Sequence, residues 1–221
     1  ITMRSGLPWD ESSTSYTDPA NDVVQLFYNP DPIRYILGKE MEAPAGTLFC
    51  YNSGATNVLG KVVDLVTGRR LDHFAADVLF QPLGIADVEW ELINDDLVFA
   101  SGGLYLRPRD MAKLGELYLR EGEWEGEEIL SSSWIAASRV RRSVVAYGWA
   151  DGYGYGWWTR TYSTASGPVE SYFAAGWGEQ QIVVVPELDL VAVFTGGSYE
   201  DAPYLSPGEM MADYVLPAVS R

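Results

Sequence analysis

The chain has 221 residues, 47% of them hydrophobic and 13% aromatic, which is enough apolar side chain to bury a sizeable core. The 31 acidic and 15 basic residues give a net charge of −16, which repels phosphate backbones and anionic membrane surfaces and excludes nucleic acid as an expected partner. No apolar run approaches the roughly 18 residues that span a bilayer, and the single cysteine, Cys50, cannot form an internal disulfide, so the compartment stays open.

The first part of the chain shows few regular elements. Residues 1–50 are rich in Gly, Pro, Ser and Asp, which predicts ordered loop with one helix near residues 21–28 and a turn at residues 29–32. Further along, apolar residues recur at helical spacing in three segments, and Gly or Pro residues are placed to end them. These predicted helices cover residues 54–67, 71–80 and about 110–121.

After residue 145 the pattern changes to short β-branched and aromatic runs separated by Gly, Pro and Asp, typical of consecutive antiparallel strands. The runs cover residues 153–159, 171–177, 181–185 and 190–195, and a closing helix is predicted at residues 207–219. We therefore predict one domain of the α/β class, of the α+β type. Its loop and helical lobe covers about residues 1–145, and its strands and C-terminal helix about residues 146–221.

Most of the usual catalytic patterns are missing. No GxSxG elbow, HExxH, P-loop or Cys/His metal spacing occurs, so neither a metal nor a cofactor is expected. The only histidine, His73, lies within a predicted helix and is interpreted as structural. The pair Asp95 and Asp96 and the glutamates of residues 123–128 are interpreted as solvated surface.

Residues 44–60, PAGTLFCYNSGATNVLG, place a tyrosine behind a loop and directly before a helix. This stretch resembles the second motif of the serine β-lactamase and penicillin-binding-protein superfamily. In that motif the tyrosine of a YxN triplet follows a Pro-Gly-Thr loop and precedes a Leu-Gly helix. Tyr51 fits the family's tyrosine, whereas Ser53 stands where Asn is usual.

The resemblance continues in order along nearly the whole chain. Its further landmarks are TMRSGL (residues 2–7), GGLY (102–105), RDMAKLG (109–115), EWEG (123–126), YGYGWW (153–158) and PELDL (186–190). It implies a β-lactamase/transpeptidase-like fold, in which the C-terminal helix covers one face of an antiparallel sheet and a helical lobe covers the other. The catalytic cleft of this fold would lie between sheet and lobe.

The family's third motif, KTG or HxG, is expected on an inner strand just before the strand that leads to Pro186. Counting back from this proline favours Ala174, Ala175 and Gly176, and WGE at residues 177–179 is the nearer alternative. Gly176 keeps the small residue that lets substrate lie against the strand, but Ala174 lacks the cationic or imidazole group. Since the family's lysine helps to hold a substrate carboxylate, the resemblance favours a small ester or amide over β-lactams and D-Ala peptides.

The first motif, SxxK, does not occur in the sequence, which also starts without Met. We therefore expect a C-terminal portion of a domain, with the nucleophilic serine upstream of Ile1. In the family's mechanism that serine forms an acyl-enzyme while lysine and tyrosine relay its proton, and two backbone N–H groups hold the oxyanion. The resemblance thus assigns catalysis to Tyr51 and Trp177, and substrate binding to Ser53 and residues 174–176.

Other interpretations stay open. In one alternative the chain is catalytically silent, as a truncated product or binding module. In another it is completed by another chain that supplies the missing segment, which would restore β-lactamase or D-Ala-peptidase activity. Structural roles are the alternatives for single residues. Tyr51 and Trp177 would then be packed aromatics, Ser53 a helix N-cap, and Cys50 a small buried side chain.

Overall fold

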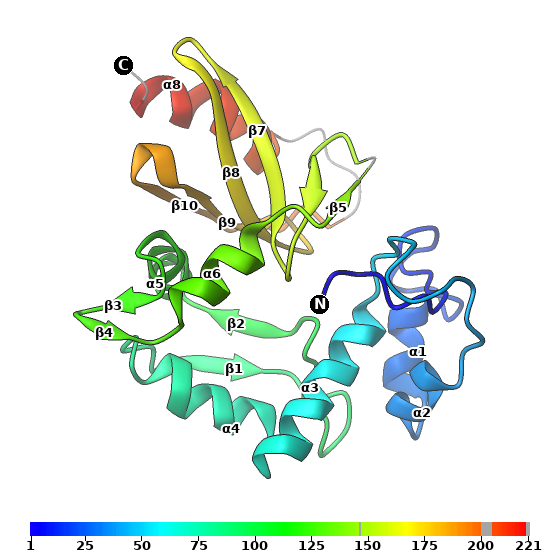
Figure 1. Cartoon of the computed structure of the whole chain (residues 1–221). Coiled ribbons are helices and arrows are strands. Elements are labelled where there is room, and N and C mark those ends of the chain that lie inside the picture. Colours follow the sequence, from blue (N-terminus) through cyan, green and yellow to red (C-terminus); the bar gives the residue numbers. More distant parts are fainter. Residues whose placement is uncertain (146, 200–204, 220–221) are drawn as a thin grey trace. The chain divides into compact units, whose positions relative to one another are not determined.

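The computed structural model describes residues 1–145, 147–199 and 205–219 (Figure 1). The chain divides into two compact units, Ile1–Tyr105 and Leu106–Arg221, and each unit has its own core. Within the described residues, every helix is too short or too polar to cross a membrane.

Helices make up most of the regular structure of the first unit. They are α1 (Asp22–Tyr28), α2 (Pro32–Leu37), α3 (Ser53–Thr67) and α4 (Leu71–Ala75), which continues into the π-helical turn η1 (Ala76–Phe80). The helices predicted near residues 21–28, 54–67 and 71–80 are confirmed, whereas α2 lies in a stretch predicted to be loop. Pro32, interpreted as part of a turn, is the first residue of α2, where its missing N–H is no loss.

The ends of α3 follow from its sequence. Asn52 caps the N-terminus, because its side chain accepts a hydrogen bond from the Ala55 N–H at 2.7 Å. Gly68 ends the helix with a φ of 68°, a left-handed conformation that glycine adopts without strain. The alternative that Ser53 is the N-cap is therefore wrong, since Ser53 is already the first helical residue.

An apolar core holds these helices and the segments around them together. Its buried members are Trp9, Val23, Leu26, Ile36, Ile93 and Leu97. Cys50, expected to be a small buried side chain, is half-buried and packs against this core. Beyond η1, β1 (Val88–Trp90) pairs with β2 (Leu104–Leu106).

A six-stranded antiparallel sheet forms the centre of the second unit. In spatial order its strands are β10 (Leu190–Phe194), β9 (Gln180–Val185), β8 (Gly167–Gly176), β7 (Trp158–Thr164), β6 (Gly152–Tyr153) and β5 (Ser143–Val144). The antiparallel strands predicted at residues 171–177, 181–185 and 190–195 are confirmed as β8, β9 and β10, whereas the run at residues 153–159 covers the end of β6, a turn and the start of β7. β8, which carries the predicted third motif, lies in the interior of the sheet.

Helices cover both faces of this sheet. They are α5 (Pro108–Leu119), α6 (Ser132–Arg139), α7 (Pro207–Met210), the π-helical turn η3 (Met211–Val215) and α8 (Leu216–Val219). On one face the Tyr172 hydroxyl of β8 donates to the Tyr118 carbonyl of α5 at 3.2 Å. The neighbouring Ser171 pairs with Arg160, whose guanidinium lies beside Gly208 of α7. Because successive strand residues point to opposite faces, α5 and the predicted C-terminal helix cover different sides of the sheet.

The boundary between the units lies after residue 105, earlier than the change of pattern predicted near residue 145. The physical reason is that α5 packs against β9 and β10 and therefore folds with the sheet. The EWEG landmark at residues 123–126 lies in a hairpin of two short strands, β3 (Glu123–Trp124) and β4 (Glu127–Glu128). Its glutamates, the Asp95–Asp96 pair and His73 are exposed, as expected for surface residues.

Candidate active site

Tyr51 lies in the first unit, immediately before the N-cap of α3, and its side chain is half-buried. The Cys50 N–H donates to the Met3 carbonyl at 2.8 Å, and the Asn52 N–H donates to the Met3 sulfur at 3.4 Å. The Cys50 thiol also lies 3.5 Å from the Trp9 carbonyl, to which it donates. The backbone of Tyr51 is therefore held on both sides by the N-terminal segment.

Met3 makes these contacts from an uncommon backbone conformation. Its φ is 53°, in the left-handed region that residues other than glycine rarely occupy, and its side chain is buried. Such conformations cost on the order of 1–3 kcal/mol and persist where surrounding contacts hold them in place. The strain therefore marks the TMRSGL segment as part of the framework around Tyr51.

Ser53, the first residue of α3, is bonded to a buried carboxylate. Its N–H donates to Glu11 Oε2 and its hydroxyl to Glu11 Oε1, both at 2.9 Å. Ser53 is only 6% exposed, so its hydroxyl hydrogen is engaged inside the unit. Substrate binding by Ser53 stays a prediction, and the contact observed for its hydroxyl is internal.

Glu11 is itself 5% exposed and also accepts a hydrogen bond from the indole N–H of Trp9. Burial raises the pKa of the Glu11 carboxyl, although the hydrogen bonds from Ser53 and Trp9 act to lower it. Glu11 was missed from the sequence, because it stands in a Ser- and Asp-rich stretch typical of exposed loop. Its partner Ser53 is 42 positions away, and no local pattern signals such a contact.

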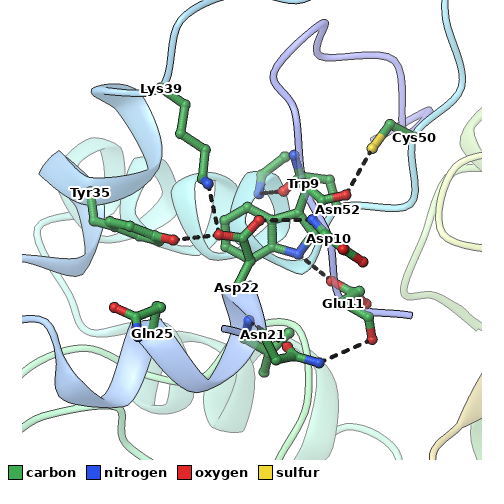
Figure 2. A network of polar contacts seen from close by, with 12 residues as sticks. Trp9, Asp10, Glu11, Asn21, Asp22, Gln25, Tyr35, Lys39, Cys50 and Asn52 are labelled. Atoms are coloured by element: carbon green, nitrogen blue, oxygen red, sulfur yellow. Dashed lines mark hydrogen bonds and ion pairs between the residues drawn. The ribbon is translucent and has the colours of Figure 1, made fainter. Parts of the chain in front are cut away.

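A second buried carboxylate, Asp22, anchors the same loop from the other side (Figure 2). One oxygen accepts the Asp10 N–H at 2.7 Å. The other accepts the Lys39 ammonium at 2.7 Å and the Tyr35 hydroxyl. Lys39 also lies over the ring of Trp9, 5.4 Å from its centroid. The loop that carries Trp9 is thus tied to α1 and α2 as well as to α3.

The predicted third motif forms the last three residues of β8, Ala174, Ala175 and Gly176, in the second unit. On one side these residues pair with the start of β9. On the other side the pairing with β7 ends at Phe173, opposite Trp158, which is the first residue of β7. The β7 side of β8 therefore extends past its neighbour, and such an edge is where an extended ligand can lie.

Ala174 is half-buried and packs against an apolar cluster of Trp157, Tyr172 and Val184. Its methyl group therefore belongs to the side of the sheet that α5 covers. The next residue, Ala175, points to the opposite face by strand alternation. Neither side chain supplies the charge that the family's lysine would bring to this strand.

Trp177 begins the turn between β8 and β9, in which Gly178 and Glu179 have φ values of 81° and 71°. Its side chain is 54% exposed and lies against Tyr199, with ring centroids 4.7 Å apart. The alternative that Trp177 fills core space is therefore wrong. The side-chain amide of Gln180 donates to the Gly178 carbonyl at 3.0 Å and steadies the turn. The nearer alternative for the third motif, WGE, forms this turn and not a strand.

The predicted site residues fall into two sets. Tyr51 and Ser53 stand together in the first unit, and residues 174–177 are consecutive in the second. The structure adds Glu11 and Met3 to the first set. Across the part of the chain that the structure describes, no three His, Cys, Asp or Glu side chains gather in a way that could hold a metal ion.

Comparison with known proteins gives a family match over most of the chain. A family model described as Beta-lactamase matches residues 1–205. The 6-aminohexanoate-dimer hydrolase of Paenarthrobacter ureafaciens is 27% identical over 208 residues, which cover 87% of this chain and 52% of that protein. The chain therefore spans about half the length of the curated relative it matches.

Solved structures share the fold. The octameric penicillin-binding protein homologue from Pyrococcus abyssi has a TM-score of 0.70 at 20% identity, covering 99% of this chain and 54% of that one. A penicillin binding protein from Bacillus halodurans has a TM-score of 0.70 at 20% identity, over 98% of this chain and 71% of that one. These similarities confirm the fold class predicted from the sequence.

Proposed function

The chain belongs to the beta-lactamase family, and from this premise we propose that it serves the serine-dependent hydrolysis of a small amide or ester through an acyl-enzyme. Support for hydrolysis comes from the family and from the relative whose name states that it hydrolyses a dimer of 6-aminohexanoate. A dimer of an amino acid is joined by an amide bond, so this relative supports amide chemistry beside ester chemistry.

The observation that carries the proposal is the placement of Tyr51 at the start of α3. We assign to its phenol the relay of the proton from the attacking serine hydroxyl toward the leaving group. A phenol with an ordinary pKa near 10 is a weak base at neutral pH, so this role requires a neighbouring ammonium group. A relay also requires a fixed donor and acceptor geometry, and the contacts of Cys50 and Asn52 with Met3 favour it.

The nucleophile is assigned to the serine of an SxxK motif. The 221 residues contain no such sequence, so none of their serines receives this role. Ser53 is the serine nearest to Tyr51 in sequence, but it is buried and its hydroxyl donates to Glu11. An attacking hydroxyl must reach a substrate carbonyl, which disfavours Ser53.

The end of β8 is proposed to hold the acyl part of the substrate. Gly176 carries no side chain that could block this end of the strand, and the backbone N–H of Trp177 is assigned as one of two donors to the oxyanion. Ala174 provides no cation for a substrate carboxylate of the kind found in penicillins and D-Ala peptides. Neutral esters and small amides are therefore the preferred substrate class, ahead of β-lactams.

The test uses the protein expressed from its complete gene. We expect turnover of a short-chain nitrophenyl ester to exceed turnover of a chromogenic β-lactam. We also expect covalent labelling by a fluorophosphonate probe. No turnover together with no adduct would contradict the proposal and favour a silent binding module. Peptide mapping of an adduct to Ser53, or to another serine of these 221 residues, would contradict the assignment of roles.

A further inference from the structure

The Glu11 carboxylate joins two segments that are far apart in sequence. Its two oxygens accept three donors: the N–H and the hydroxyl of Ser53, and the indole N–H of Trp9. The loop on which Glu11 stands is fixed in turn by the Asn21 side chain, which donates to the Glu11 carbonyl at 3.3 Å (Figure 2). Glu11 therefore links the N-terminal loop to the first residue of α3 through both carboxylate oxygens.

A carboxylate suits this position for a specific reason. The first four N–H groups of a helix have no partner inside the helix, and Ser53 supplies the first of them in α3. Asn52 satisfies a later one by accepting from Ala55. Glu11 satisfies that of Ser53 with a negative charge at the positive end of the helix dipole, which strengthens the contact. The N-terminal turn of α3 is thereby held by two side chains, one local and one distant.

Burying a carboxylate is costly, so this one is poorly explained by stability alone. Burial is the largest effect on the pKa of Glu11 and raises it, and the nearby carboxylate of Asp22 raises it further. An apolar or neutral residue would avoid this penalty. Buried ionisable groups with perturbed pKa values gather at functional sites, and Glu11 contacts Ser53, two residues after Tyr51.

We propose that Glu11 is a positioning residue for Tyr51, which it holds in its reactive place by fixing Ser53 and the first turn of α3. The inference rests on the proposed function, because it assumes that Tyr51 relays a proton. Glu11 and Ser53 are 5% and 6% exposed, so the role inferred for Glu11 does not require it to touch the substrate. Their effect passes through the backbone between Tyr51 and Ser53.

The first test is kinetic and uses the protein expressed from its complete gene. Glu11→Gln keeps the size of the side chain but replaces one acceptor by a donor. We expect its kcat for the nitrophenyl ester to fall by about 10- to 100-fold, with KM little changed, because a small misplacement of a catalytic group acts on the chemical step. Ser53→Ala retains the backbone contact to Glu11, so its kcat should fall less than that of Glu11→Gln. Glu40→Gln, an exposed glutamate of the same unit, is the matched control and should behave as wild type.

The second test does not depend on activity. Hydrogen exchange of the backbone amides of residues 51–55 should be at least about tenfold faster in Glu11→Gln and in Ser53→Ala, because the opening free energy of this turn falls. Exchange in α5 of the second unit should not change. Equal exchange of residues 51–55 in wild type and both variants would overturn the inference.

The two tests separate the inference from the proposed function. If the wild-type protein hydrolyses the ester and Glu11→Gln has the wild-type kcat, the role of Glu11 is wrong while the hydrolase proposal stands. If the wild-type protein neither turns over the ester nor reacts with fluorophosphonate, the proposed function fails. In that case the exchange experiment alone decides whether Glu11 orders the segment around Tyr51, and unchanged exchange still refutes it.

Discussion

The two sets of site residues are held in place by different physical means. Around Tyr51, side chains do the holding: the Met3 sulfur and the Glu11 carboxylate accept hydrogen bonds from the backbone of Asn52 and Ser53. At the end of β8, backbone pairing with β9 holds Ala174 to Gly176 in place, and the side chains of these residues are small. One region is therefore sensitive to its side chains, and the other is sensitive to the position of its strands.

The largest expected effect is that of Tyr51→Phe, which removes the phenol hydroxyl and leaves the backbone contacts of Cys50 and Asn52 intact. Proton relay by a side chain contributes about 10²–10⁴-fold to a rate, so we expect kcat for the ester to fall within this range without loss of folded protein. Steady-state kinetics of the complete protein measures it. Tyr28→Phe is the control, since Tyr28 is an exposed tyrosine at the end of α1 and should retain full activity.

The strand-held region should respond to Gly115→Ala in α5. A Cβ at this position would lie 2.6 Å from Val191 Cγ1 and 2.9 Å from Ile182 Cγ2, so α5 would have to move away from β9 and β10. Despite the higher helix propensity of alanine, we expect the free energy of unfolding to fall by about 1–3 kcal/mol. Denaturant titration measures this loss. Gly148→Ala, where a Cβ meets no atom within 4 Å, should change stability little, and an equal loss in both variants would contradict the packing explanation.

The side-chain-held region should respond to pH through Glu11. Its raised pKa means that the folded protein holds this proton more tightly than the unfolded chain does. The pH-dependent part of the contribution of Glu11 to stability is therefore fully present below its ordinary pKa of 4.5 and is lost as pH rises through the raised folded pKa. Urea titrations of wild type and Glu11→Gln across this range should show the stability of wild type, relative to the variant, falling with pH. If the stability of wild type relative to Glu11→Gln rose with pH, burial would not be the dominant effect on the pKa of Glu11.

The smallest effect should come from Trp177→Ala, despite the size of the side chain. Its indole is 54% exposed and contacts Tyr199, so we expect a loss of only about 0.5–1.5 kcal/mol in stability. The role assigned to Trp177 belongs to its backbone N–H, which alanine retains. Ester kcat should therefore stay within about threefold of wild type. A loss as large as that of Tyr51→Phe would show that the indole itself takes part in the reaction.

Sequence patterns predicted the elements whose signals are local. The apolar spacing of residues 54–67 and the glycine at 68 mark α3 correctly, and β-branched runs mark β9 and β10. The helix α2 was not predicted, because Asn29 and Pro32 favour a turn as readily as a helix start. The packing of α5 on the sheet was not predicted, since nothing in α5 itself shows that it packs on strands more than sixty residues later.

The site residues that lie in family motifs could be predicted from the sequence, and those that depend on long-range contacts could not. Tyr51 and the end of β8 were identified from motif order, and their roles stay proposals. Glu11 could not be found in this way, because its significance lies in a contact with Ser53 across 42 positions. Met3 lies within the TMRSGL landmark, but its left-handed φ and its sulfur contact are visible only in three dimensions.

Detecting the acyl-enzyme by mass spectrometry is the most direct test of the proposed chemistry. The complete protein should be mixed with excess nitrophenyl ester, quenched in acid at short times and weighed intact by mass spectrometry. We predict a species heavier by one acyl group in wild type and in Tyr28→Phe, formed at least about 10²-fold more slowly in Tyr51→Phe. Turnover without any acylated species at any time, or acylation at the wild-type rate in Tyr51→Phe, would contradict it.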